Sequence, residues 1–232
     1  HNLVLWGGGD WNDSLNNCGM KGKGESVWLS IATVKAINDF TKICERFKKD
    51  FSLEKLKQSK EELRKAIIEH GFENDRFIYG YNDVGDKIGS KECEEGKIYL
   101  NPQTWSVLAE IFAKDEAINV MNTVEKELRC DYGYVQVYPA YSKGTDDIGR
   151  ASYFYPGNFE NGSVYNHGVS FKIAADLKLG LVDRAYETLK MISYDNPKNL
   201  NNGMEPYAFS NMFLGPECTC RKGYAPQSWI TG

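Results

Sequence analysis

The segment GGGDWNDSLN, residues 7–16, places a tryptophan between two aspartates in a glycine-rich stretch. Trp11 offers a flat apolar face of the kind that stacks on a pyranose ring, and Asp10 and Asp13 are each able to donate a proton to a leaving oxygen. The same residue types also suit a turn, in which an aspartate accepts backbone N–H bonds or caps the following helix. The segment therefore predicts either part of a sugar-cleaving site or a structural turn.

The segment FENGSVYNHG, residues 159–168, adds another acid and an imidazole, Glu160 and His167. Inverting cleavage of a glycosidic bond needs an acid on one face of the sugar and a nucleophile delivered to the other. Glu160 is a candidate for half of such a pair. His167, in the same loop, is a candidate hydrogen-bond donor to an anion, although a lone histidine is more often part of the hydrogen-bonded structure. The last five residues, SWITG at 228–232, end in a hydroxyl and a glycine amide that are able to bind phosphate oxygens.

The composition argues against a polyanion as main partner and leaves open whether the many aromatic residues bind a sugar or pack in a core. The 232 residues include 5 Trp and 14 Tyr, and the formal net charge is −4. Surfaces that bind nucleic acid or anionic membranes need a basic excess. The sequence has no apolar run of about 18 residues that would span a bilayer and no signal-peptide pattern at its start. We therefore expect no nucleic-acid or membrane partner and a cytoplasmic location.

The cysteines do not form a recognisable metal motif. Six are scattered along the chain, and only Cys218 and Cys220 are close, in a C-x-C that matches no common zinc spacing. We expect structural or free thiols and no metal site.

Apolar periodicity predicts the elements that must position these residues. Apolar residues recur every three or four positions from Val27 to Phe47, which is the helical period. Further helices are predicted from a capping box at Ser59 and Glu62 to about Gly71, from Asn101 to Phe112, and from a cap at Asp115 to Leu128. A third pair follows at 169–179 and 182–192, joined at Gly180, and Pro226 is suited to begin one more helix.

Long segments without helical periodicity separate the helix pairs. They are residues 76–100, 131–168 and 195–224. Helical hairpins alternating with long loops favour a mainly α fold in which the hairpins ring an axis, an α/α toroid, and three pairs would be about half of a closed ring. An open α-solenoid is the alternative, but its repeats should resemble each other at a fixed period, and these do not.

Several motifs, in order, resemble glycoside hydrolase family 94, the inverting disaccharide phosphorylases that include cellobiose, laminaribiose and chitobiose phosphorylases. They are GGGDWNDSLN, GKGESVWL, NPQTWSVLA, YPAYSKGTDDIGRASYFYPGNFENGSVYNHG, NMFLGP and SWITG. The resemblance extends from about Leu5 to the last residue. It implies an (α/α)6 catalytic barrel, of which residues 1–232 would be the C-terminal portion, with an N-terminal β-sandwich, linker helices and the first barrel helices outside this sequence.

The resemblance also implies roles for individual residues. The family's general acid falls on Asp13 and its donor-sugar tryptophan on Trp11, so that Asp10 would have a supporting role. The sugar-binding glutamate falls on Glu160. The phosphate-binding residues fall on His167, Thr231 and Gly232.

The implied reaction needs inorganic phosphate as co-substrate and no other cofactor. Phosphate carries a nucleophilic oxygen at neutral pH, so the site needs donors that orient the anion instead of a base. A β-glucoside would give α-glucose 1-phosphate and a free acceptor sugar. Many relatives have Gly-Met where this chain has Ser14-Leu15, so the linkage stays open, and we expect residues 195–224 to select the acceptor.

Two other functions stay open from the sequence. One is an inverting hydrolase with Asp13 as acid and Glu160 as base. The other is an inactive sugar-binding fragment that needs a missing half, because the chain does not begin with Met and the family's upstream arginines are not in it. We also expect the remaining half of the enzyme as a partner, and a homodimer.

Overall fold

A computed structural model of the chain describes residues 1–49, 51–206 and 208–227. Within these residues the helices are α1 (Val27–Arg46), α2 (Leu53–Gly71), α3 (Leu100–Leu108), α4 (Lys114–Glu127), α5 (Arg150–Tyr153), α6 (Asn166–Leu179) and α7 (Val182–Met191). The two-residue strands are β1 (Val4–Leu5), β2 (Glu25–Ser26), β3 (Phe72–Glu73), β4 (Arg76–Phe77), β5 (Gly80–Tyr81), β6 (Lys87–Ile88), β7 (Ile98–Tyr99), β8 (Arg129–Cys130), β9 (Gly133–Tyr134), β10 (Val137–Tyr138), β11 (Val164–Tyr165) and β12 (Met212–Phe213).

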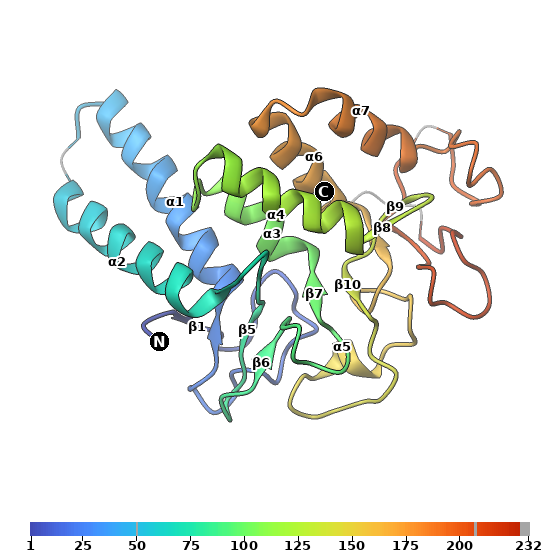
Figure 1. Ribbon diagram of the computed structural model, residues 1–232, viewed down its shortest axis with the longest axis horizontal. Coiled ribbons are helices and arrows are strands. Elements are labelled where there is room, and N and C mark those ends of the chain that lie inside the picture. The colour runs from blue at the N-terminus through green and yellow to red at the C-terminus, as the bar shows by residue number, and fades with distance from the viewer. Residues whose placement is uncertain (50, 207, 228–232) are drawn as a thin grey trace.

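Three helical hairpins, α1–α2, α3–α4 and α6–α7, form one layer of the molecule (Figure 1). The first helices of the hairpins are neighbours, with α3 packed between α1 and α6. The sequence prediction of three hairpins separated by long segments is confirmed, but the segment 131–168, which was predicted without a helix, contains the short helix α5. No helix in the described part of the chain has the length and apolar character that crossing a bilayer requires.

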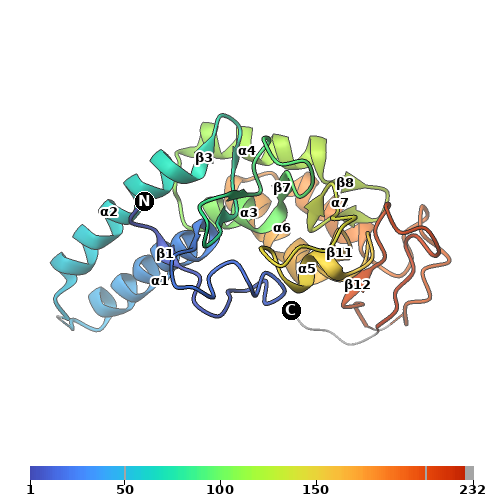
Figure 2. The same cartoon turned by 90° about the horizontal axis from the view of Figure 1, so that it is seen from below.

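Each hairpin is closed by a pair of short antiparallel strands. Strand β2 comes directly before α1, β7 before α3 and β11 before α6. These strands pair with β5, β10 and β12, which lie beyond the second helix of each hairpin. The pairing brings the N-terminal ends of α1, α3 and α6 and the connecting loops to the same side of the helical layer. Figure 2 views the molecule from this side, where the blue N-terminal segment runs between α1 and α5.

A cluster of large aromatic side chains supports the loops on this side. Trp6, Trp28, Tyr79 and Tyr99 are all buried there, and the rings of Trp6 and Tyr79 stack with their centroids 5.3 Å apart. A loop region with this much buried aromatic surface has a rigid base. The loops that carry Trp11 and Asp13 are therefore fixed to the helical layer.

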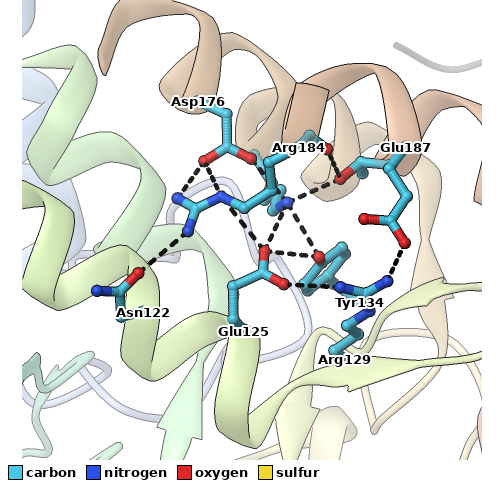
Figure 3. Close-up of polar contacts among 9 residues, drawn as sticks. Asn122, Glu125, Arg129, Tyr134, Asp176, Arg184 and Glu187 are labelled. Carbon is cyan, nitrogen blue, oxygen red and sulfur yellow. Dashed lines mark hydrogen bonds and ion pairs between the residues drawn. The ribbon is translucent and has the colours of Figure 1, made fainter. Parts of the chain in front are cut away.

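A buried charge cluster joins α6 to α4 and α7 (Figure 3). Lys172 on α6 is fully buried, and its Nζ lies 2.8 Å from Glu125 Oε1 of α4 and 2.7 Å from Asp176 Oδ2. Arg184 of α7 donates from Nε to Asp176 Oδ1 at 3.0 Å. Burial raises the pKa of Glu125, but the hydrogen bonds from Lys172 and Tyr134 outweigh this and leave that pKa below its usual value. Each buried charge thus has an opposite partner, as burial requires.

Two predicted helix starts are wrong. Helix α2 begins at Leu53, so the predicted capping residue Ser59 lies inside it, because the partly buried stripe of Leu53, Leu56 and Leu63 extends upstream of Ser59. Helix α4 begins at Lys114, after Ala113, so Asp115 lies in its first turn and not at the cap. There its negative charge interacts favourably with the helix dipole.

Two predicted boundaries in the functional region also differ. Helix α3 ends at Leu108, because Ile111 N bonds back to Ser106 O and Glu110 takes a φ of 59°. Helix α6 begins at Asn166, three residues before the predicted Val169, so His167 lies on a helix and not in a loop. The predicted helix from Pro226 falls mostly on residues outside the described ranges.

Candidate active site

Asp10 holds the 7–16 segment against the start of α1. Its carboxylate accepts hydrogen bonds from Asn12 N at 2.9 Å, Ser26 Oγ at 2.7 Å and Tyr79 OH at 2.9 Å. Ser26 is the N-cap of α1 and also accepts a hydrogen bond from Leu29 N. The alternative interpretation of Asp10 as a turn residue is therefore correct in part, since it forms a turn with Asn12 but does not cap the helix.

The environment of Asp10 raises the pKa of its carboxyl. Burial raises the pKa of Asp10 to about 6, although the hydrogen bonds from Ser26, Asn12 and Tyr79 each act to lower it. Desolvation penalises the charged carboxylate more than these donors compensate. Because all three donors come from the protein, the Asp10 carboxyl has a structural role.

Asp13 differs from Asp10 in being open to solvent. Its side chain is 77% exposed, and Arg150 Nη2 lies 3.3 Å from its Oδ1. The same Nη2 donates to the backbone oxygen of Asp13 at 3.0 Å. An exposed carboxyl on a fixed backbone is accessible to a substrate, and Arg150 holds it in place.

Arg150 is itself held against the 7–16 segment by backbone contacts. Ala151 N donates to Ser14 O at 2.9 Å, and Arg150 N donates to Asn16 Oδ1 at 3.0 Å. Gly149, with a φ of 97°, comes so close to Asn16 that an added Cβ would lie 2.6 Å from its Oδ1. The glycine is therefore required for this approach. Sequence reasoning did not identify Arg150, and its only signal is its position directly after Gly149.

The indole of Trp11 contacts the imidazole of His167. Trp11 Nε1 and His167 Nδ1 are 3.2 Å apart, and the ring centroids are 5.4 Å apart. Tyr165 and Phe171 contact the Trp11 ring edge-on, with centroid distances of 5.5 and 6.0 Å. Two residues that are distant in sequence, both predicted as site residues, thus meet in one aromatic group.

This contact determines which nitrogen of His167 carries the proton. An indole N–H can only donate, so Nδ1 of His167 accepts and the neutral ring bears its proton on Nε2. Burial lowers the pKa of His167, which favours this neutral form. His167 is also in the first turn of α6, where the partial positive charge of the helix end attracts anions.

Glu160 lies close enough to Asp13 for their charges to interact. Burial raises the pKa of Glu160, the charge of Asp13 raises it further, and the charge of Arg150 and a hydrogen bond with Ser14 lower it. The pKa of Tyr165 is likewise raised, first by burial and then by the charges of Glu160 and Asp13. The two predicted acids and Tyr165 therefore share one electrostatic environment.

The loop that carries Glu160 is fixed by its neighbour Asn161. The fully buried Asn161 side chain donates to Tyr141 O at 2.9 Å and to Phe154 O at 2.7 Å, and accepts from Tyr141 N at 2.7 Å. Both donors of this amide and its carbonyl oxygen are thus bonded to backbone groups. The position of Glu160 is therefore set by backbone contacts.

Of the six predicted site residues, Trp11 and His167 are in direct contact, and Asp13 and Glu160 lie within electrostatic range of each other. The other two, Thr231 and Gly232, lie outside the described residues. Tyr165, which sequence reasoning did not single out, connects the group through its contact with Trp11 and its response to both acids. Its signal in the sequence was only its place between Glu160 and His167.

Comparison with known proteins identifies the family of the chain over the whole sequence. Residues 1–232 match a family described as the glycosyl hydrolase 94 superfamily, catalytic domain. Solabiose phosphorylase of Paenibacillus borealis is 40% identical over 100% of this chain. Cellobionic acid phosphorylase of Neurospora crassa is 31% identical over 97% of it, and 3-O-β-D-glucopyranosyl-β-D-glucuronide phosphorylase of P. borealis is 33% identical over 93%.

The chain spans about a third or less of these relatives, 30%, 29% and 28% of their lengths. Among solved structures, the GH63 mannosylglycerate hydrolase from Thermus thermophilus, in complex with glucose, superposes with a TM-score of 0.60 at 13% identity. That match covers 89% of this chain and 44% of the hydrolase chain. At this identity the likeness concerns the fold alone.

Proposed function

The chain belongs to the glycosyl hydrolase 94 superfamily, as its motifs predict, and on that premise we propose that the protein phosphorolyses a β-linked glucose disaccharide with inversion. Inorganic phosphate attacks the anomeric carbon, and α-glucose 1-phosphate and an acceptor sugar leave. The named activities of the relatives support phosphorolysis, since they are phosphorylases. We further propose that the three hairpins form part of an (α/α)6 toroid and that the protein acts as a cytoplasmic homodimer.

Asp13 is the proton donor in this proposal. Its carboxyl is exposed in the free protein and lies within electrostatic range of Glu160. A bound sugar that covers Asp13 removes water from it and raises the cost of its charge, so that the acid holds a proton for the leaving oxygen. Arg150 has to release the carboxylate for this to occur, because a neutral acid no longer attracts the guanidinium.

His167 orients phosphate through Nε2–H. The bond from Trp11 occupies Nδ1, so the remaining ring nitrogen is a donor and suits a phosphate oxygen. The start of α6 adds a favourable dipole. Thr231 and Gly232 complete the phosphate site by family resemblance.

Trp11 and Glu160 bind the donor sugar. The Trp11 N–H is hydrogen-bonded to His167, and the ring makes T-shaped contacts with Tyr165 and Phe171, so the ring is held firmly. In this proposal the ring forms a wall for the apolar face of glucose. Glu160 accepts hydrogen bonds from sugar hydroxyls. The single observation that carries the proposal is the Trp11–His167 contact, because it joins the sugar wall to the phosphate donor.

The choice of disaccharide follows the named activities of the relatives. We propose to test solabiose first, then cellobionic acid and the glucosyl glucuronide, with cellobiose and laminaribiose as the neutral comparison. Residues 195–224 supply the acceptor contacts in this proposal.

Phosphate dependence distinguishes phosphorolysis from the two alternatives. The intact protein is incubated with each disaccharide, with and without phosphate, and glucose and glucose 1-phosphate are measured. Glucose 1-phosphate that forms only with phosphate supports the proposal. Release of glucose without phosphate would identify an inverting hydrolase with Glu160 as base. Residues 1–232 alone, if they bind the disaccharide in calorimetry but do not turn it over with phosphate, would identify an inactive sugar-binding fragment.

A further inference from the structure

Cys218 and Cys220 lie in one loop with their sulfur atoms 3.4 Å apart. Cys220 is exposed, whereas Cys218 is buried. A disulfide bond is about 2.05 Å long, so roughly 1.3 Å of movement would join the two atoms. Neither residue is among the proposed catalytic, donor-sugar or phosphate-binding residues, although both lie in the 195–224 segment that is proposed to contact the acceptor. The C-x-C spacing matches no common zinc motif.

The surroundings of Cys218 activate its sulfur. Backbone N–H groups of Arg221 and Cys220 and the thiol of Cys220 bond to it, and the charge of Lys222 is nearby. Burial acts to raise the pKa of Cys218, but these donors outweigh it and leave that pKa below its usual value. Burial raises the pKa of Cys18, Cys93 and Cys130 instead. A thiolate stabilised in this way is the nucleophilic form of cysteine.

The loop with Cys218 is in backbone contact with the loop that carries Glu160. Gly215 N donates to Gly157 O at 2.7 Å. A Cβ on Gly157 would lie 2.5 Å from Cys218 N and 2.8 Å from Cys218 Cβ, so no space separates the two segments. Gly157 N in turn donates to Asn161 O at 2.8 Å, next to Glu160. A movement of Cys218 is therefore transmitted to the Glu160 loop.

We propose that Cys218 and Cys220 are an oxidisable dithiol that takes a hydroperoxide as oxidant, and that the resulting disulfide displaces the Glu160 loop. The Cys218 thiolate attacks one peroxide oxygen, the O–O bond breaks, and a sulfenic acid and hydroxide form. The Cys220 thiol then attacks the Cys218 sulfur, the S–O bond breaks, and hydroxide leaves with the thiol proton as water. In sum, two thiols and one hydrogen peroxide give one disulfide and two waters, with sulfur oxidised and oxygen reduced.

The chemical test needs no activity. The intact protein is reduced, freed of reductant, treated with hydrogen peroxide and alkylated, and the peptide that contains both cysteines is weighed. We expect it to lose the mass of two hydrogen atoms and to take up no alkylating agent, and a reductant should reverse this. If both thiols are still alkylated under conditions that oxidise free glutathione, or if either is found bridged to another chain, the dithiol assignment is wrong.

Two variants make the test specific. Cys220→Ser changes an exposed side chain and removes the resolving thiol, so Cys218 should be trapped as a sulfenic acid by a dimedone reagent. Cys93→Ser is the matched control, because that thiol lies outside the pair, and it should leave disulfide formation unchanged. A disulfide in the Cys220→Ser protein would contradict the assignment.

The effect on turnover rests on the proposed function and is measured separately. Peroxide should lower phosphorolysis on the order of tenfold, below the roughly hundredfold cost of displacing a site group by a full ångström. Reductant should restore it, and Cys220→Ser should keep its turnover under the same treatment. Full turnover of a protein shown by mass to hold the disulfide would refute the coupling to Glu160. Absence of any turnover in the reduced protein would instead count against the proposed function, while the mass result still decides the dithiol.

Discussion

Trp11 donates its indole N–H to Nδ1 of His167 at 3.2 Å, across 156 positions of sequence. This one bond ties the N-terminal segment to the start of α6 and fixes the histidine tautomer with its proton on Nε2. A donor on Nε2 serves an anion, whereas a bare Nε2 would repel it. The proposed sugar wall and the proposed phosphate donor are therefore positioned by each other.

Replacement of Trp11 by Phe should separate these two effects. The ring face remains for the sugar, but the N–H is lost and His167 is free to rotate or change tautomer. A neutral hydrogen bond contributes about 1 kcal/mol, which corresponds to roughly a fivefold loss in kcat/KM for phosphate. Initial rates at varied phosphate measure it.

Trp105→Phe is the matched control for that variant. Trp105 also contacts Phe171 edge-on, at 5.3 Å, but its N–H is buried without a hydrogen-bond partner among the described residues. The control should leave the kcat/KM for phosphate unchanged. An equal loss of kcat/KM in both variants would show that ring packing, and not the bond to His167, is responsible.

Replacement of Asp13 by Asn should remove the proton donor while leaving the fold intact. We expect turnover from α-glucose 1-phosphate and acceptor to fall by about 10²-fold or more. Because Asp13 is mostly exposed, the loss of its surface pair with Arg150 should change the midpoint of thermal unfolding little. Undiminished synthesis by this variant would refute the role of Asp13.

Replacement of Arg150 by Gln should change the pH profile. The positive charge of Arg150 acts to lower the pKa of Glu160, so its removal should raise that pKa further. If turnover requires ionised Glu160, the acidic limb of the rate profile moves to higher pH. Rates measured across the acidic and neutral range decide this, with Lys143→Gln, an exposed basic residue in the same loop, as control. If turnover falls at the same acidic pH in the Arg150→Gln variant as in the unchanged protein, the ionisation of Glu160 does not control the acidic side of the profile.

The helical layer was predictable because its signal is local. The apolar stripe from Val27 predicted α1, and Gly180, with a φ of 79°, ends α6 where the sequence places a glycine. The pairing of β11 with β12 was not predictable, because it joins Tyr165 to Met212 through tertiary contacts. That pairing starts α6 early and places His167 on the helix.

The candidate site was predictable only as residue types in two segments. Trp11 and His167 stood out in their motifs, but nothing local indicates a bond between them. Arg150 was missed because a charged residue in a polar loop usually faces solvent, and its contact with Asp13 depends on how two loops pack. Lys172 reads as an exposed helix residue, yet it is fully buried because its partners come from α4 and α7.

The ionisation of Asp10 should make the free energy of unfolding depend on pH, in a direction that the pKa shift determines. Its pKa is about 6 in the folded protein and about 3.9 in an unfolded chain. Between these values the folded state binds more protons than the unfolded state, so the contribution of Asp10 to stability falls as pH rises from about 4 to 6 and is constant above. Asp10→Asn should remove this part of the slope. Urea unfolding at about pH 4.5 and about pH 7 measures it, and an unchanged slope would contradict the shift.

The charge cluster around Lys172 should make α6 sensitive to loss of one buried cation. Lys172→Met keeps the aliphatic stem but leaves Glu125 and Asp176 without the ammonium that lies 2.8 and 2.7 Å from them. Removal of one partner from a buried ion pair costs about 3–5 kcal/mol, and because Arg184 still pairs with Asp176 and Glu125 we expect a loss at the lower end of this range. Denaturant unfolding of the intact protein should show this loss.

Lys178→Met is the matched control on the same helix, because the Lys178–Glu110 pair is at the surface and contributes about 0–1 kcal/mol. The difference between the two variants isolates the effect of the buried cluster, since both remove one lysine charge from α6. Equal losses would show that the cluster adds nothing beyond a surface pair, and that α6 and His167 are held by apolar packing alone.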